Sequence, residues 1–183
     1  MTLYHYFERS GGPLRNLSDL PPEEARRVLD GIRAAGSGFA ASRAEGYLSR
    51  RLELEKTVRA MFISKGGAPR RKAPHYFVVE RCPWLETWYS DAAHIALAIG
   101  ALDSSAVSFT YGDMFPTFSP RVADGREYRG QVYTHAEILP LIEKYGLPQR
   151  WNPDGAHGPE RYIEAQVWCE LPPELLMPEG PGR

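Results

Sequence analysis

Apolar residues recur with a helical period in the stretch from Phe39 to Gly67. At about 100° per residue, one face of such a helix carries Tyr47, Leu54, Val58, Met61 and Phe62. The pattern predicts one long amphipathic helix, closed by a glycine pair, with the other elements packed around it. Two shorter helices are predicted over 21–35 and 134–145, the first from a proline-rich entry and the second from a Thr-x-x-Glu capping box.

Two charged residues, Arg51 and Glu55, interrupt the apolar face of the long predicted helix. They are four positions apart, so their side chains can meet. Charges placed among core residues are costly unless they are paired or bound to something. We therefore expect a polar site on the inner side of this helix. In it, Arg51 would bind an anionic group and Glu55 would be a candidate catalytic carboxylate.

Short apolar runs predict strands over 2–8, 75–80, 94–102, 106–111 and 161–169. The last two alternate in character. In the fourth strand, Ser108 and Thr110 oppose an apolar face, and in the fifth the side opposite the small apolar residues holds Tyr162, Glu164, Gln166 and Trp168. These elements predict an α+β fold: a mostly antiparallel sheet, with the long amphipathic helix packed on one face and two shorter helices around it.

The polar strand faces define a candidate pocket if the long helix covers them. Its catalytic residues would be Glu55 and Glu164, and its ligand-binding residues would be Arg51, Ser108, Thr110, Gln166, Tyr162 and Trp168. The pocket would bind or transform a small anionic ligand. The alternative is a solvated strand face, with Arg51 and Glu55 forming a purely structural ion pair. The sequence leaves open whether the protein is an enzyme.

Composition narrows the choice of function. The chain has 183 residues and a net charge of −1, which favours one domain (1–171) with a flexible proline-rich tail (172–183) and gives no electrostatic case for nucleic acid. No secretory signal and no apolar run of about 18 residues is evident, so we expect a cytoplasmic protein without a membrane partner. Its histidines lack metal-ligand spacing, so no metal is expected, and no motif names a cofactor.

Two other segments suggest alternative functions. The basic loop 65–72 holds Lys65, Arg70, Arg71 and Lys72 and could serve a nucleic-acid-binding or regulatory module. The aromatic segments 84–89 and 114–118 could serve a protein-interaction module, including a homodimer.

The runs LYHYFE, GPLRNLSDL, SFTYGDMFPTFSP and YIEAQVW resemble a group of uncharacterised bacterial proteins of similar length. That resemblance extends over nearly the whole chain and implies a bacterial cytosolic protein, without an assigned activity. A second, more distant resemblance is to ADP-ribosyltransferases, through the opening LYH and a glutamate on a late strand. It implies His5 and Glu164 as the matching functional residues, with Tyr111 or Tyr76 stacking on a ligand ring.

Overall fold

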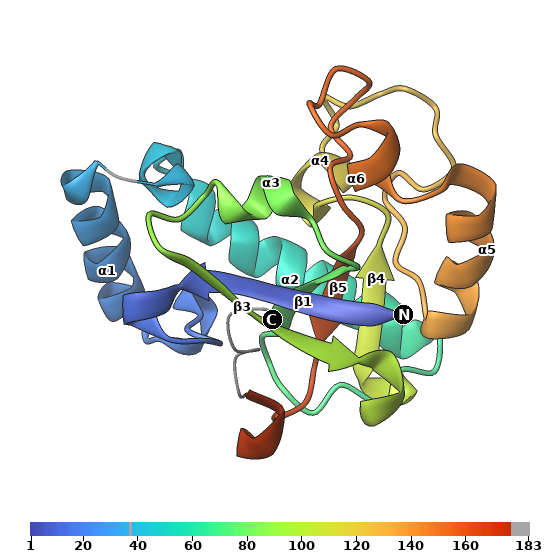
Figure 1. Ribbon diagram of the computed structural model, residues 1–183, viewed down its shortest axis with the longest axis horizontal. Helices are drawn as coiled ribbons and strands as arrows, with labels where there is room; N and C mark the ends of the chain where they lie inside the picture. Colours follow the sequence, from blue (N-terminus) through green and yellow to red (C-terminus); the bar gives the residue numbers. More distant parts are fainter. Residues whose placement is uncertain (37, 177–183) are drawn as a thin grey trace, which may run out of the picture.

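A computed structural model describes residues 1–36 and 38–176, and its centre is a five-stranded antiparallel sheet (Figure 1). The strands are β1 (Thr2–Glu8), β2 (His75–Val79), β3 (Ala92–Ala98), β4 (Val107–Thr110) and β5 (Glu164–Val167), in the order β3-β1-β2-β5-β4. The helices are α1 (Pro22–Ala35), α2 (Tyr47–Ser64), α3 (Pro83–Glu86), α4 (Met114–Thr117), α5 (His135–Tyr145) and α6 (Pro148–Trp151). The predicted α+β class with an antiparallel sheet is confirmed.

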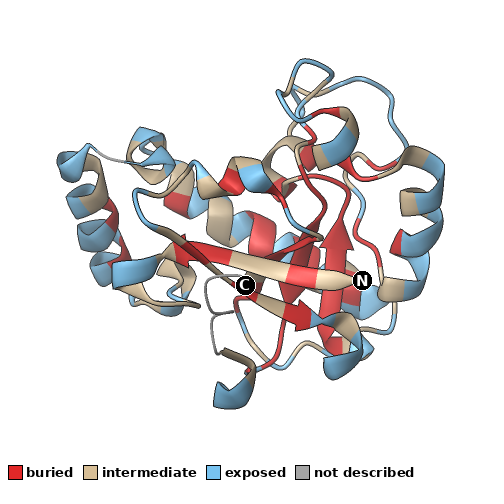
Figure 2. Ribbon diagram, in the orientation of Figure 1, coloured by how far each residue is buried: buried red, intermediate tan, exposed pale blue. Residues whose placement is uncertain are grey.

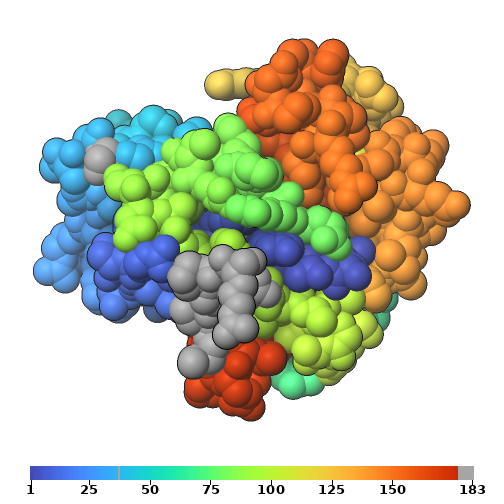
Figure 3. All heavy atoms as spheres, viewed as in Figure 1, coloured from blue at the N-terminus to red at the C-terminus, as the bar shows by residue number. Residues whose placement is uncertain are grey.

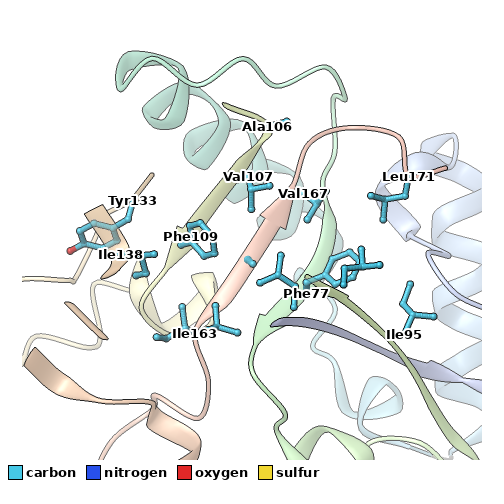
Figure 4. Close-up of a cluster of buried hydrophobic side chains, with 14 of the residues drawn as sticks. Phe77, Ile95, Ala106, Val107, Phe109, Tyr133, Ile138, Ile163, Val167 and Leu171 are labelled. Atoms are coloured by element: carbon cyan, nitrogen blue, oxygen red, sulfur yellow. The ribbon is translucent and has the colours of Figure 1, made fainter. Parts of the chain in front are cut away.

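The two faces of the sheet pack against different helices, as the alternation within β4 and β5 requires. One face belongs to the largest apolar cluster, in which Val107, Phe109 and Val167 pack with Ile138 of α5 (Figure 4). The other face meets α2, where Leu54, Val58 and Phe62 pack around Trp168. Both β4 and β5 are buried along their whole length (Figure 2). The polar residues of these strands therefore lie inside the molecule.

The long helix is shorter than the predicted stretch from Phe39 to Gly67. Residues Phe39–Ser42 form a separate 3-10 helix, and α2 begins after Gly46. Its buried residues are Leu48, Leu54, Glu55, Val58 and Phe62. Leu48 was missing from the predicted apolar face because it packs against α1, in a small cluster with Ala25 and Leu29. The helical periodicity of one segment predicts a single buried face, so it does not reveal that the helix also packs against a second element.

Other boundaries also differ from the prediction. β3 ends at Ala98 rather than Leu102, because Ile99–Ala101 turn into a 3-10 helix. The predicted loop 114–120 contains the one-turn helix α4, which starts where the Asp113 side chain accepts a hydrogen bond from the Phe115 N–H at 2.7 Å. At the predicted tail, Pro173–Leu176 form a 3-10 helix whose leucines pack against the large cluster. Residues 177–183 lie outside the described part.

Substituting Gly67 tests the packing at the end of α2, and substituting Gly31 in α1 serves as its control. A Cβ on Gly67 would lie 2.6 Å from three ring carbons of Phe62, whose side chain is fully buried. We expect Gly67→Ala to lower the free energy of unfolding by about 1–3 kcal/mol, because the ring has no space to move into. Gly31→Ala is the matched control. Its Cβ meets nothing within 4 Å inside α1, so a gain of about 0.5–1 kcal/mol is expected. Urea denaturation measures both, and equal effects would contradict the packing.

Candidate functional site

A cavity of about 780 Å³ opens where β1 and β2 separate. These strands pair only at Leu3–Val79 and Tyr4–Val78, although β1 continues to Glu8. Residues 4–8 and 76–78 line the cavity from the sheet. The remaining walls come from the loop after β1, from α1, from the 3-10 helix before α2 and the start of α2, from the segments after α3 and β4, and from β5 with the residues just before it. The divergence of the two strands therefore creates the space.

His5 fastens the separated strands to each other. Its Nδ1 lies 2.7 Å from the Tyr76 carbonyl oxygen, and its Nε2 accepts a hydrogen bond from the Leu14 N–H at 3.0 Å. The ring is therefore the neutral tautomer protonated on Nδ1. Burial lowers the pKa of His5 to about 4. Both ring nitrogens are used by the main chain, so His5 shapes the cavity wall.

Arg51 lines the cavity from α2, and its charged group is held by four neighbours. The Nε atom donates to Ser18 Oγ at 2.9 Å and Glu55 Oε1 at 3.0 Å, Nη1 donates to Tyr47 OH at 2.8 Å, and Nη2 donates to Asn16 Oδ1 at 2.7 Å. The guanidinium carbon also lies 4.4 Å from the centre of the Tyr76 ring. Although burial disfavours its charge, Tyr76, Tyr47 and Glu55 raise the pKa of Arg51 above its ordinary value.

Glu55 lies behind Arg51 and does not line the cavity. Its Oε1 accepts hydrogen bonds from Ser18 Oγ at 2.7 Å, Arg51 Nε at 3.0 Å and Tyr76 OH at 2.6 Å. The side chain is only 3% exposed. Glu55 thus joins α2 to β2 and to the loop after β1, and it fixes the orientation of the arginine.

Two of the carboxyl groups that line the cavity, Asp113 and Glu164, interact electrostatically with Arg51. Asp113 accepts hydrogen bonds from the Phe115 N–H at 2.7 Å and from Tyr162 OH at 2.9 Å. Glu164 Oε1 accepts one hydrogen bond, from Gln166 Nε2 at 3.0 Å. Burial raises the pKa of both carboxyl groups, and for Glu164 the charge of Asp113 raises it further.

A buried chain of hydrogen bonds supports Glu164 from behind. Trp168 Nε1 donates to Ser108 Oγ at 2.8 Å, Ser108 donates to Gln166 Oε1 at 2.7 Å, and Gln166 Nε2 donates to Thr110 Oγ1 at 3.1 Å and to Glu164. Apart from Trp168, which directly follows β5, these residues come from the neighbouring strands β4 and β5, where Ser108 pairs with Gln166 and Thr110 with Glu164. The chain fixes the position of the Glu164 carboxyl group.

Of the eight residues proposed from sequence for the candidate pocket, the structure places three on the cavity wall: Arg51, Tyr162 and Glu164. It places the others directly behind that wall: Glu55, Ser108, Thr110, Gln166 and Trp168. The alternative hypothesis, that these polar residues form a solvated strand face, is wrong. Ser108, Thr110 and Gln166 are fully buried, and Glu164 is 6% exposed.

Sequence reasoning missed Asp113, Asn16 and Ser18. Asp113 follows a predicted strand directly, which is a common position for a functional side chain, and that signal could have identified it. Asn16 and Ser18 belong to an irregular loop with no periodic pattern. Only the folded chain brings them to α2, some 35 residues further along, where Asn16 meets Arg51.

The other predicted surfaces have different environments. In the basic loop, Lys65 pairs with Glu137, Arg70 with Asp103 and Arg71 with Asp19, so most of its charge is neutralised within the chain. In the aromatic segment after β2, Trp88 stacks on Phe39 with ring centres 3.9 Å apart. The segments 38–47 and 83–91 lie side by side in Figure 3. Trp88 also lines the cavity, so this contact supports part of its wall.

The ADP-ribosyltransferase hypothesis stays a prediction. Its two proposed residues, His5 and Glu164, line the same cavity. Of the tyrosines suggested for stacking, Tyr76 also lines it, whereas Tyr111 belongs to the apolar cluster on the opposite face of the sheet.

Comparisons with protein-family models, with curated proteins and with solved structures gave no match. Within residues 1–36 and 38–176, no group of three or more His, Cys, Asp or Glu side chains is placed to hold a metal ion. Over the same residues, no helix has the length and apolar character that crossing a membrane requires.

Proposed function

We propose that this protein binds a small organic anion in the cavity between α2 and the sheet, with Arg51 as the group that recognises the negative charge. The proposal rests on the hydrogen-bond donors of the Arg51 guanidinium that have no acceptor among the described residues. Each of its terminal nitrogens bears a pair of hydrogens, yet Nη1 and Nη2 each have a single acceptor among the described residues. A carboxylate or phosphate in the cavity would accept the remaining hydrogens.

The surroundings of Arg51 favour such a ligand. Its side chain is 11% exposed, so a bound anion would interact with it under weak solvent screening. The four neighbours already fix the orientation of the guanidinium, and a preorganised donor loses little entropy when a ligand binds. Two more arginines, Arg15 and Arg43, also line the cavity.

The cavity walls near Arg43 and Arg51 favour a ligand with a flat or apolar body. Tyr47 and Phe115 stack with centres 5.1 Å apart and planes at 5°, and the Arg43 guanidinium lies 4.4 Å from the Tyr47 ring centre. Trp88 and Tyr89 line the cavity further along. Aromatic walls with a few placed polar groups are typical of small-molecule sites.

Ligand binding to an arginine variant tests this proposal. We would titrate benzoate, phenyl phosphate and acetate into the wild-type protein and into Arg51→Met/Glu55→Gln by isothermal calorimetry. The second substitution removes the buried charge that the first would leave unpaired. At least one anion should bind the wild type, and the double variant should bind it at least about tenfold more weakly, as loss of a charge-assisted pair predicts.

Arg50→Met is the matched control, because Arg50 lies on the exposed side of α2 and pairs with Glu53. It should bind the anions like the wild type. Equal affinity in the Arg51 variant and the wild type, or no binding of any of the three anions, would overturn the proposed function.

A further inference from the structure

Glu164 differs from the other buried glutamates of the described residues in having no counter-ion. Glu55 pairs with Arg51, and Glu160 pairs with Arg129. No Lys, Arg or His nitrogen of the described residues lies within 4.0 Å of the Glu164 carboxylate, or of its neighbour Asp113. A buried carboxylate without a cation is costly, so this exception points to a partner that comes from outside the chain.

Glu164 lines the cavity and has one carboxylate oxygen without a hydrogen-bond donor among the described residues. Its Oε1 takes the hydrogen bond from Gln166, whereas Oε2 has no donor among the described residues. The side chain is 6% exposed, and it lines the cavity together with Asp113. The backing chain through Gln166 and Ser108 fixes the carboxyl group in this orientation. Glu164 is thus a buried acceptor on the wall of the ligand site, with hydrogen-bonding capacity left on one oxygen.

We infer that the ligand is zwitterionic: besides the anionic group on Arg51, it carries a protonated amine that binds Glu164 Oε2 and Asp113. This inference rests on the proposed function. An ammonium group supplies what the Glu164 carboxylate lacks among the described residues: a positively charged counter-ion and an N–H donor for its second oxygen. Charge-assisted hydrogen bonds to a buried carboxylate are about twice as strong as neutral ones.

The titration of the two carboxyl groups is consistent with this ligand. Burial raises the pKa of Glu164 and of Asp113, and Asp113 raises that of Glu164 further, while Arg51 lowers both. The other charged or titratable groups around them are Glu55, Arg43, Tyr76 and Tyr162. A bound ammonium would favour the ionised carboxylates, so binding should release protons to the buffer.

Matched ligands of varied length test the inference. We would measure the affinity of the wild type for 3-aminopropanoate, 4-aminobutanoate, 5-aminopentanoate and 4-(aminomethyl)benzoate, and for the same molecules without the amine. The series varies the separation between the two charges. At least one amino acid of the series should bind about tenfold or more tightly than its amine-free partner. Calorimetry in two buffers of different ionisation enthalpy should show proton release.

The variant Glu164→Gln should abolish that advantage, so that the amino acid and its amine-free partner bind the variant with affinities within about twofold of each other. Glu53→Gln is the control, because Glu53 lies on the exposed side of α2. If the amine-free anions bind the wild type and their amino derivatives bind no better, the inference fails and the proposed function stands. If no anion binds the wild type, the proposed function fails and the inference fails with it. An equal loss for both ligand types in Glu164→Gln would also overturn the inference.

Discussion

Replacing Arg51 with methionine is expected to lower the free energy of unfolding by about 3–5 kcal/mol, because it leaves the buried Glu55 carboxylate without its cation. Ser18 and Tyr76 would still donate to Glu55 Oε1, but neither brings a positive charge. Arg51 also joins Tyr47 and Asn16, and those contacts would be lost together. Domains of this size have unfolding free energies of about 5–15 kcal/mol, so the variant should still fold.

The double variant Arg51→Met/Glu55→Gln separates the charge effect from the contact effect. A neutral glutamine accepts the same two hydroxyl donors at little desolvation cost, so we expect it to recover about half or more of the loss. Urea denaturation at pH 7 measures the wild type and both variants. A loss below about 1 kcal/mol in the single variant would indicate a solvent-screened pair of the kind found on protein surfaces.

The elements of this fold that local pattern determines were predictable. The alternation of Ser108 and Thr110 with apolar neighbours placed them on one strand face, and the four-residue spacing of Arg51 and Glu55 predicted the contact that is observed at 3.0 Å. The capping box at Thr134 correctly located the start of α5. Each of these signals depends on neighbours within a few residues, which a single sequence contains.

The cavity itself was not predictable, because its cause is long-range. β1 leaves β2 after Tyr4 although its sequence continues as a strand, and the separation is bridged by His5 and the Leu14 N–H. Leu14 adopts a positive φ of 60° to make that contact, a conformation that is uncommon for leucine. Asp113 reaches the cavity only because β4 lies at the edge of the sheet beside β5. Such features follow from strand order, which one sequence specifies weakly.

Acid should destabilise this protein through His5, the residue that fastens the separated strands. Burial lowers its pKa from 6.5 to about 4, so the folded state holds the neutral ring while the unfolded chain takes up a proton below pH 6.5. The contribution of the neutral His5 ring to the free energy of unfolding is complete above pH 6.5, and it is lost as the pH falls toward 4. At about 1.4 kcal/mol per pH unit, the loss reaches about 3 kcal/mol. His75, whose pKa burial also lowers to about 4, adds a loss in the same direction.

Unfolding by urea at pH 7, 6, 5 and 4.5 would measure this loss, with His5→Gln as the test variant. Glutamine offers one donor and one acceptor but does not titrate, so His5→Gln should be less stable than wild type at pH 7 and lose less on acidification. The exposed His157→Gln is the control and should keep the wild-type slope.

Glu164 opposes the histidines in this range. Its raised pKa means that its charge costs stability as the pH rises above about 4.5, so the wild-type curve shows only the difference between the two effects. The variant Glu164→Gln should therefore show a steeper loss on acidification than the wild type. If His5→Gln loses as much stability on acidification as the wild type, the neutral, doubly bonded ring is not what holds the two strands at their separation.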